Sequence, residues 1–252
     1  MLVKLGRYMC PTKIPSMSEE GGEPETGALS DLNPEWELLP ANYDSGSGKY
    51  LNSVTSPASG AAQSDYDATP INALTVSGDS FVFGTGARFD QINTAFMNEL
   101  HHYDSTNFNI GHPWTIFVRG VFTITSSVFF LKTKGGLEGV RMKLNDGSNI
   151  ISGDQENGSS QSRTFSATNT MPTNTDTTLV ISWDPTSGTM RVYVGEQTVD
   201  EFDPLWYDAN GTAQSDNQIW FSPGSTIKSI GMLRRFINDT EAGTIKSYLN
   251  NL

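Results

Sequence analysis

The amino-acid sequence predicts an all-β domain of antiparallel strands, with a short C-terminal helix and an extended N-terminal arm. From residue 75 onward, short apolar or alternating runs follow one another, separated by glycine, proline, asparagine, aspartate and serine. Such runs are typical of antiparallel strands joined by turns. Residues 1–74 are rich in acidic residues, glycine and proline, and they lack a long apolar pattern of either period. We therefore divide the chain into an arm, residues 1–74, and a β-domain, residues 75–252.

The β-domain is expected to begin with a hairpin and a long core strand. Residues 74–76 and 81–83 are apolar and flank the polar turn 77–80. Residues 114–125 then alternate with the period of a strand. The apolar residues that share one face of this strand are Trp114, Ile116, Val118 and Phe122.

The middle of the domain continues the same pattern. Residues 128–132 form an apolar run, and residues 139–144 alternate until they reach Asp146-Gly147. Asp-Gly favours a tight hairpin turn because glycine supplies the positive φ that the turn requires. A further hairpin is predicted from residues 178–183 and 189–194, which alternate on either side of a Ser-Gly turn.

Two strands and a helix are expected to complete the domain. Residues 218–221 and 227–233 are the last apolar runs, and Asn238 with Glu241 forms a capping-box signal at a helix start. We also predict a helix over residues 89–101, whose apolar face would begin at Phe89. The packed stripe of the C-terminal helix is expected to consist of Ala242, Ile245 and Leu249.

The arm contains one apolar cluster within acidic surroundings, around Trp36. Three alternatives remain open for it: the segment folds back on the β-domain, it docks onto another subunit, or it is disordered. Arms that become ordered on binding cover a large partner surface with few residues. If the second alternative holds, the docking residues are Leu32, Trp36, Leu38 and Leu39.

Charge and composition exclude several classes of function. The 252 residues include 28 acidic and 16 basic side chains, which gives a net charge of −12. Such a chain would be repelled by the phosphates of DNA or RNA and by anionic membranes, so we expect it to bind neither. No window has the roughly 20 apolar residues of a membrane-spanning helix. Lys4 and Arg7 interrupt the N-terminal apolar stretch, so we expect no secretion signal. Cys10 is the single cysteine, which excludes an internal disulfide.

Three segments resemble the laminin-G-like branch of the concanavalin A-like lectin/glucanase superfamily: residues 112–120, 178–196 and 230–242. The second is similar to the branch's hairpin with a Tyr-Val-Asn-Gly strand, although here Gly195 follows Val194 directly and the asparagine is missing. The resemblance implies a two-sheet antiparallel jelly-roll sandwich whose relatives range from inactive through sugar-binding to polysaccharide-cleaving. Sandwiches of this kind also resemble decoration and fibre modules of bacteriophage virions.

The catalytic patterns of the superfamily are incomplete in this chain. Its glucanases carry Glu-x-Asp-x-x-Glu, whereas here Glu201 and Asp203 are followed by Trp206 at the third position, with Pro204 between. Its lyases carry a Gln-Ile-His strand, but Trp220 follows Gln218-Ile219. We therefore predict that the chain is not an enzyme.

Ligand and metal candidates lie in polar loops. Trp206 and Tyr207 offer aromatic faces for a sugar, and the polar groups around them are Asp203, Asp208 and Asn210. Adjacent His101 and His102 lack the spacing of a zinc motif. No metal or cofactor is predicted; calcium is the one candidate. Its possible ligands are Asp146, Asp154, Glu156, Asp208, Asn210, Asp216 and Asn217.

The sequence thus predicts a non-enzymatic structural protein of a bacteriophage virion: a capsid decoration, head-fibre or tail-associated protein. Its expected partners are other virion proteins, further copies of itself as a homo-oligomer, and host surface glycans. It would be assembled in the host cytoplasm. The alternatives are a free carbohydrate-binding lectin and, less favoured, a polysaccharide lyase or glycoside hydrolase.

Overall fold

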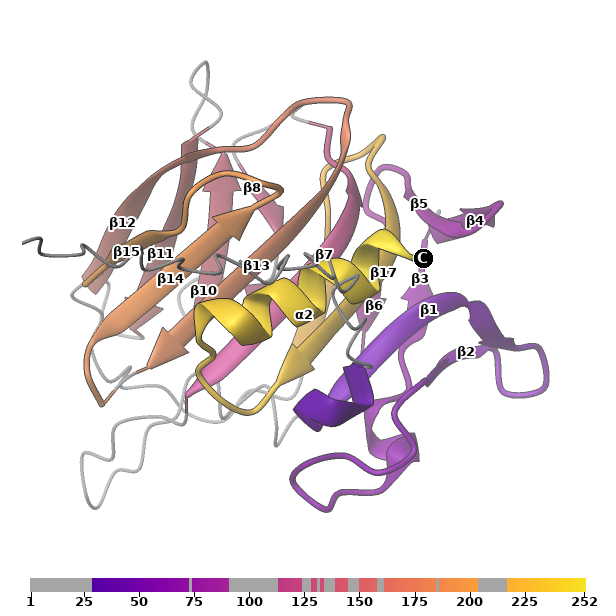
Figure 1. Ribbon diagram of the computed structural model, residues 1–252. Helices are drawn as coiled ribbons and strands as arrows, with labels where there is room; N and C mark the ends of the chain where they lie inside the picture. The colour runs from indigo at the N-terminus through magenta and orange to yellow at the C-terminus, as the bar shows by residue number, and fades with distance from the viewer. Residues whose placement is uncertain are drawn as a thin grey trace, which may run out of the picture.

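The computed structural model describes residues 29–72, 74–90, 113–123, 128–130, 132–133, 139–144, 150–157, 161–184, 186–203 and 217–252. For residues 128–165 and 217–218 it describes the backbone alone. Three hydrogen-bonded sheets, two single-turn 3-10 helices and one α-helix make up this part of the chain (Figure 1).

The largest sheet has nine strands and forms one layer of the molecule. Seven strands follow one another across it: β15 (Asp200–Phe202), β14 (Thr189–Val194), β13 (Asp176–Asp184), β7 (Trp114–Val121), β17 (Thr226–Leu233), β1 (Trp36–Asp44) and β2 (Lys49–Asn52). The hairpin of β4 (Leu74–Ser77) and β5 (Ser80–Phe83) joins this sheet through β17.

Two smaller sheets form the opposite layer. One contains, in order, β12 (Gln161–Thr170), β11 (Ile150–Asn157), β10 (Gly139–Leu144) and β8 (Val128–Phe130). The other contains β3 (Thr69–Ile71), β6 (Arg88–Asp90), β16 (Asn217–Trp220) and β9 (Lys132–Thr133). All strand pairings in the described ranges are antiparallel. The predicted all-β antiparallel sandwich is confirmed.

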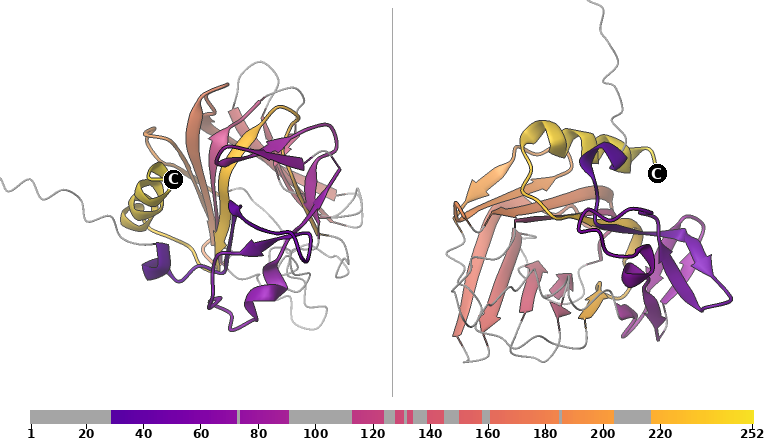
Figure 2. Two further views of the ribbon diagram at one scale, coloured as in Figure 1. Left: turned by 90° about the vertical axis from the view of Figure 1, so that its right-hand side faces the viewer. Right: turned by 90° about the horizontal axis from the view of Figure 1, so that it is seen from below.

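The large sheet is buried on both faces. Because side chains alternate along a strand, Ile116 and Val118 of β7 enter the core between the layers, whereas Phe117 points to the opposite face. There it meets Val180 and the helix α2 (Asp239–Asn250), which lies across the outer face of the sheet (Figure 2). This second apolar cluster explains why β7 and β13 are nearly continuously apolar.

The C-terminal helix forms as its sequence predicts. The Asn238 side chain accepts a hydrogen bond from the Glu241 backbone N–H at 3.0 Å, and the Glu241 carboxylate accepts one from the Asn238 backbone N–H at 3.0 Å. The predicted stripe of Ala242, Ile245 and Leu249 is buried. No helix in the described residues is long and apolar enough to cross a membrane.

The predicted strands are also confirmed, with local turn chemistry as expected. The β13–β14 hairpin turns at Gly188 with φ 71°, and the β4–β5 hairpin turns at Gly78 with φ 61°. The apolar face predicted for residues 114–125 lies in the main core. The predicted hairpin turn at Asp146-Gly147 lies outside the described residues.

Two predictions need correction. Phe89, assigned to the start of a helix, lies on strand β6 and is fully buried between the layers, while residues 91–101 lie outside the described chain. Residues 29–72 are not an arm beside the β-domain, because β1 pairs with β17 from Trp36↔Met232 to Leu38↔Ile230. The segment therefore completes the large sheet, as in the folded-back alternative.

Candidate functional site

Strand β1 places an acidic side chain on the helix-covered face of the large sheet. Trp36 and Leu38 point into the main core, so Glu37 between them points toward α2. Only 2% of Glu37 is exposed. A carboxylate is costly to bury unless hydrogen-bond donors surround it, so its partners decide whether the position is stable.

Three hydroxyl groups from three distant elements donate to Glu37. The Ser229 Oγ on β17 and the Tyr248 Oη on α2 lie 2.7 Å and 2.9 Å from Oε1. The Ser53 Oγ after β2 lies 2.8 Å from Oε2, and Tyr248 also lies 2.9 Å from that oxygen. The carboxylate thus ties the edge of the sheet, the helix and the segment after β2 together.

The surroundings shift the proton affinities of this cluster. Burial raises the pKa of the Glu37 carboxyl above its ordinary value, and the hydrogen bonds from Ser229, Ser53 and Tyr248 act in the opposite direction. Burial, together with the charge of Glu37 and the hydrogen bond to it, also raises the pKa of Tyr248 well above its ordinary value. Tyr248 is therefore a stable hydrogen-bond donor across the physiological pH range.

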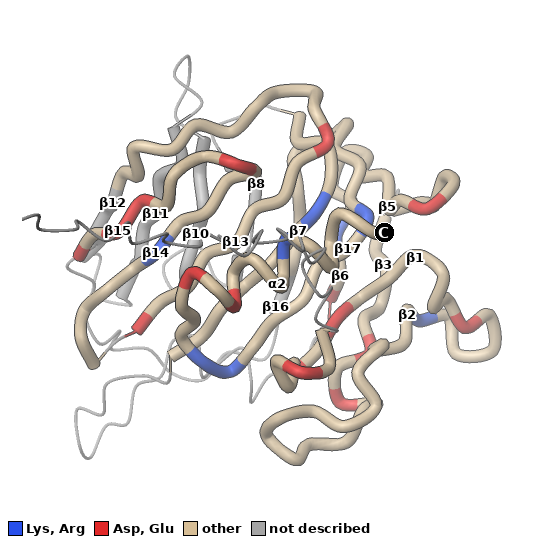
Figure 3. Tube along the Cα trace, in the orientation of Figure 1, with Lys and Arg blue, Asp and Glu red and all other residues tan. Residues whose placement is uncertain are grey.

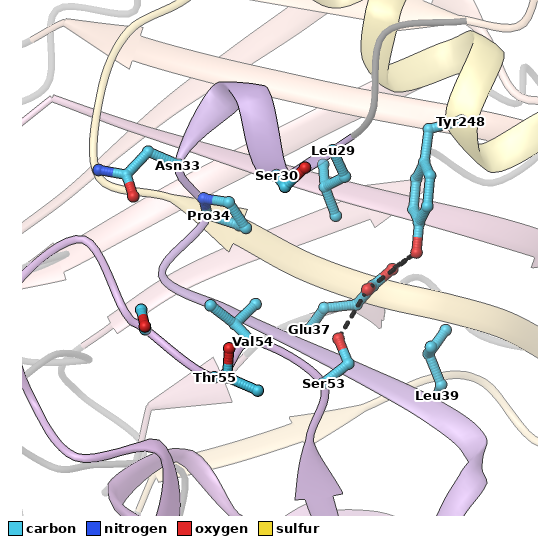
Figure 4. Close-up of a pocket in the computed structure, with 11 residues that line it drawn as sticks. Leu29, Ser30, Asn33, Pro34, Glu37, Leu39, Ser53, Val54, Thr55 and Tyr248 are labelled. Carbon is cyan, nitrogen blue, oxygen red and sulfur yellow. Dashed lines mark hydrogen bonds between the residues drawn. The ribbon is translucent and has the colours of Figure 1, made fainter.

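A cavity of about 490 Å³ opens above Glu37 (Figure 4). It lies between the 3-10 helix η1 (Leu29–Leu32), β1, the segment after β2 and the C-terminal turn of α2. Its walls combine apolar and polar side chains. The apolar lining consists of Leu29, Pro34, Leu39, Val54 and the Tyr248 ring, and the polar lining of Ser30, Asn33, Glu37, Ser53, Thr55 and Ser56.

Four of these polar side chains remain available to a ligand. No hydrogen bond joins the side chains of Ser30, Asn33, Thr55 and Ser56 to another group in the described chain, and all four are exposed. Asn33 holds a left-handed backbone conformation with φ 54°, which asparagine adopts more readily than most residues. The rim of the cavity therefore presents neutral hydrogen-bonding groups above an apolar interior.

A second buried carboxylate anchors the segment that forms one wall. Glu35 is fully buried and accepts hydrogen bonds from the Ser59 backbone N–H at 2.8 Å, the Ser59 hydroxyl and the Tyr66 hydroxyl of the 3-10 helix η2 (Gln63–Tyr66). Asn52 adds bonds to the Val54 backbone N–H and C=O, both at 3.1 Å. The wall is thus fixed at both ends, and the cavity is preformed.

The predicted sugar platform falls mostly outside the described residues. Four of its five residues lie outside the described ranges: Trp206, Tyr207, Asp208 and Asn210. Asp203 is described and exposed, directly after β15. Glu201 and Asp203 are the two carboxylates that were compared with the glucanase pattern. Glu201 forms an ion pair at 2.6 Å with Arg191 on the neighbouring strand.

The predicted docking residues are mainly core residues of this chain. Leu32 is 7% exposed, Trp36 1% and Leu38 is fully buried. Leu39 is partly exposed and lines the cavity. Leu32, Trp36 and Leu38 therefore pack within this chain, and docking of another subunit at Leu39 stays a prediction.

The described residues contain no group of three or more His, Cys, Asp or Glu side chains that could hold a metal ion. His101, His102, Asp146, Asp208, Asn210 and Asp216 lie outside them, and for Asp154, Glu156 and Asn217 the backbone alone is described. Calcium binding stays a prediction.

Sequence analysis missed Glu37, Ser53 and Tyr248 as a site. The one local signal is an acid between Trp36 and Leu38, which in an alternating strand normally marks a solvent-facing position. Its serine and tyrosine partners are 16 to 211 positions away along the chain, and no spacing rule connects them.

Comparison with solved structures shows the fold at low sequence identity. The receptor-binding domain of botulinum neurotoxin D matches with a TM-score of 0.54 and 9% identity, over 86% of this chain and 52% of that domain. The binding domain of botulinum neurotoxin serotype D/C VPI 5993 matches with a TM-score of 0.59 and 9% identity, over 88% of this chain and 53% of that domain. This chain thus spans about half the length of these toxin domains.

A smaller match is the CBM40 of Ruminococcus gnavus IT-sialidase bound to α2,3-sialyllactose, with a TM-score of 0.42 and 13% identity over 54% of this chain and 82% of that one. A match at this level supports no inference about the site. No protein-family model and no curated protein sequence matches the chain.

Proposed function

We propose that the chain is a non-catalytic recognition domain that binds a glycan in the cavity above Glu37. The observation that carries this proposal is the combination of an apolar interior with a rim of unpaired neutral hydroxyl and amide groups. A sugar ring has the complementary chemistry, with apolar C–H faces and hydroxyl groups around its edge. The volume of about 490 Å³ lies in the range of small-molecule sites.

Rigidity favours such binding. The Glu35 and Glu37 networks hold both walls in place before a ligand arrives, so little ordering has to accompany association. The Tyr248 ring stands at one wall with its hydroxyl fixed on Glu37, which leaves its apolar faces as part of the lining (Figure 4).

The proposed absence of catalysis rests on the carboxylates. Glycoside hydrolysis generally uses two carboxyl groups that flank the scissile bond. Glu37 is the one carboxylate in the described cavity lining, and its oxygens already accept four hydrogen-bond contacts. Glu201 is paired with Arg191 on the sheet edge. Neither is free to act as an acid or a nucleophile.

The shared fold is compatible with this proposal and carries less weight. The toxin domains are binding domains by name, and a sandwich at 9% identity supports the architecture rather than the ligand. The role of the domain in a larger assembly has separate support: the net charge of −12 and the sequence resemblance favour display on a bacteriophage virion, where host surface glycans would be the ligands. Co-sedimentation of the native protein with phage particles tests that second candidate, and a free small oligomer contradicts it.

A panel of immobilised glycans tests the proposed function, followed by titration of each hit in solution. Val54→Phe fills the cavity and is expected to weaken binding at least tenfold. Val76→Phe is the matched control, because Val76 is 41% exposed on β4 and does not line the cavity. Trp206→Ala with Tyr207→Ala tests the loop predicted from sequence. Binding that survives Val54→Phe but is lost in the double variant would place the ligand on that loop and refute the cavity.

A further inference from the structure

The charges around the cavity carry an inference about which sugar it accepts. Residues 29–72, which supply ten of the eleven lining residues, contain six acidic side chains and one basic side chain, Lys49. Lys49 lies at the start of β2 in the β1–β2 hairpin and does not line the cavity. Figure 3 shows the resulting run of acidic positions along this part of the chain. The acidic residues are Asp31, Glu35, Glu37, Asp44, Asp65 and Asp67.

Glu37 is the charged group in the described lining. Three hydroxyl groups donate to its two carboxylate oxygens, an arrangement that suits the ionised form, which accepts hydrogen bonds and donates none. Three donors already occupy the carboxylate and only 2% of Glu37 is exposed, so little of it is open to a ligand. It acts on a ligand through its charge and by holding Ser53 and Tyr248 in position.

Two basic side chains near α2, Arg119 and Lys246, make their contacts outside the cavity. Arg119 forms an ion pair with Asp176 at 2.9 Å and donates to the backbone carbonyl of Leu249. Lys246 donates to the Gly195 carbonyl at 3.1 Å. Neither lines the cavity. Within the described lining, no positive charge therefore offsets Glu37.

We infer that the cavity selects uncharged sugars and rejects sugars that carry a carboxylate. This inference rests on the proposed function and adds the class of ligand. If the carboxylate of an acidic sugar lay about 6 Å from Glu37, at an effective dielectric constant of about 20, the two charges would repel each other. This repulsion would weaken binding of the acidic sugar about 100-fold relative to its neutral counterpart. The hydroxyl and amide groups of Ser30, Asn33, Thr55 and Ser56 are suited to neutral hydroxyls and supply no compensating charge.

Paired ligands test the inference most cleanly. The methyl glycosides of glucose, galactose and mannose are compared with those of glucuronic, galacturonic and mannuronic acid, since each pair differs only in a hydroxymethyl group replaced by a carboxylate. Affinities are measured by NMR titration of the full-length protein. The expected result is that a neutral member binds and its acid binds about 100-fold more weakly.

Two variants show whether charge is the cause. Glu37→Gln removes the buried charge and is expected to reduce the preference for the neutral sugar to less than tenfold. Thr55→Lys adds a cation at the exposed rim and is expected to reduce it as well, without touching the buried network. Thr75→Lys makes the same change on β4, outside the cavity, and is expected to leave the preference unchanged.

Failure of the charge selection can be distinguished from failure of glycan binding itself. Equal binding of both members of a pair by the wild-type protein overturns the charge selection and leaves glycan binding intact. An unchanged preference in both Glu37→Gln and Thr55→Lys also overturns it, because the discrimination then has another origin. If no sugar of either kind binds, the proposed function fails and the inference fails with it.

Discussion

Replacing Trp36 by alanine distinguishes a core strand from a docking arm. Trp36 is 1% exposed, belongs to the main core cluster and pairs across the backbone with Met232 of β17. If the segment is part of the sandwich, the truncation leaves a cavity within this chain. If instead the segment serves another subunit, the isolated protein loses little stability and the assembly is lost.

The expected magnitude follows from the burial of Trp36. Removing a fully buried tryptophan costs about 3–5 kcal/mol of unfolding free energy. The indole Nε1 has no hydrogen-bond partner among the described residues, so the truncation leaves no acceptor unpaired and the cost arises from lost packing. For a chain of this length, the melting temperature should fall by about 10 °C.

Urea denaturation of the purified protein measures this difference, with Tyr43→Ala as the control. Tyr43 lies on the same strand but is 50% exposed, with its ring 5.0 Å from that of Tyr50, so its removal should cost about 1 kcal/mol or less. A Trp36→Ala variant as stable as the control would refute the placement of β1 in the core.

Three further predictions concern stability. Because burial raises the folded-state pKa of Glu37, the native state binds more protons than the unfolded chain between the two pKa values, and wild-type stability falls as pH rises through that interval. Glu37→Gln lacks this loss, so its unfolding free energy relative to wild type should increase from about pH 4 to about pH 8 in urea titrations; a constant difference would contradict the burial effect. Gly231→Ala should cost about 3 kcal/mol, because a Cβ atom there would lie 2.2 Å from the Phe117 ring, whereas Gly243→Ala on α2, with nothing within 4 Å, should gain up to about 1 kcal/mol. Equal thermal shifts in those two variants would be incompatible with the packing of α2 and β17. Asn238→Ala removes the helix cap and should cost about 1 kcal/mol by the same denaturation assay, and a neutral result would exclude a stabilising role for the capping box.

Sequence alone predicts the parts of this fold whose signals are local. The β13–β14 hairpin follows from strict alternation on both sides of a Ser-Gly turn, and α2 follows from Asn238 and Glu241 at capping-box spacing. In each case the residues that determine the structure lie within a few positions of one another.

The position of β1 has no such signal. Its buried Glu37 and the proline at position 40 disturb the expected pattern, and its partner β17 lies about 190 residues later in the chain. The apolar cluster around Trp36 is visible in the sequence, but alternation cannot tell whether it packs within the chain or against a partner. The cavity depends on this same long-range pairing, which is why its residues could not be predicted.

A crystal structure of the protein soaked with a methyl glycoside that binds in solution tests the central claim most directly. The account predicts electron density for an uncharged sugar between η1, the segment after β2 and Tyr248, in contact with the rim side chains of Asn33 and Thr55. Sugar density outside this cavity, at full occupancy, would contradict it.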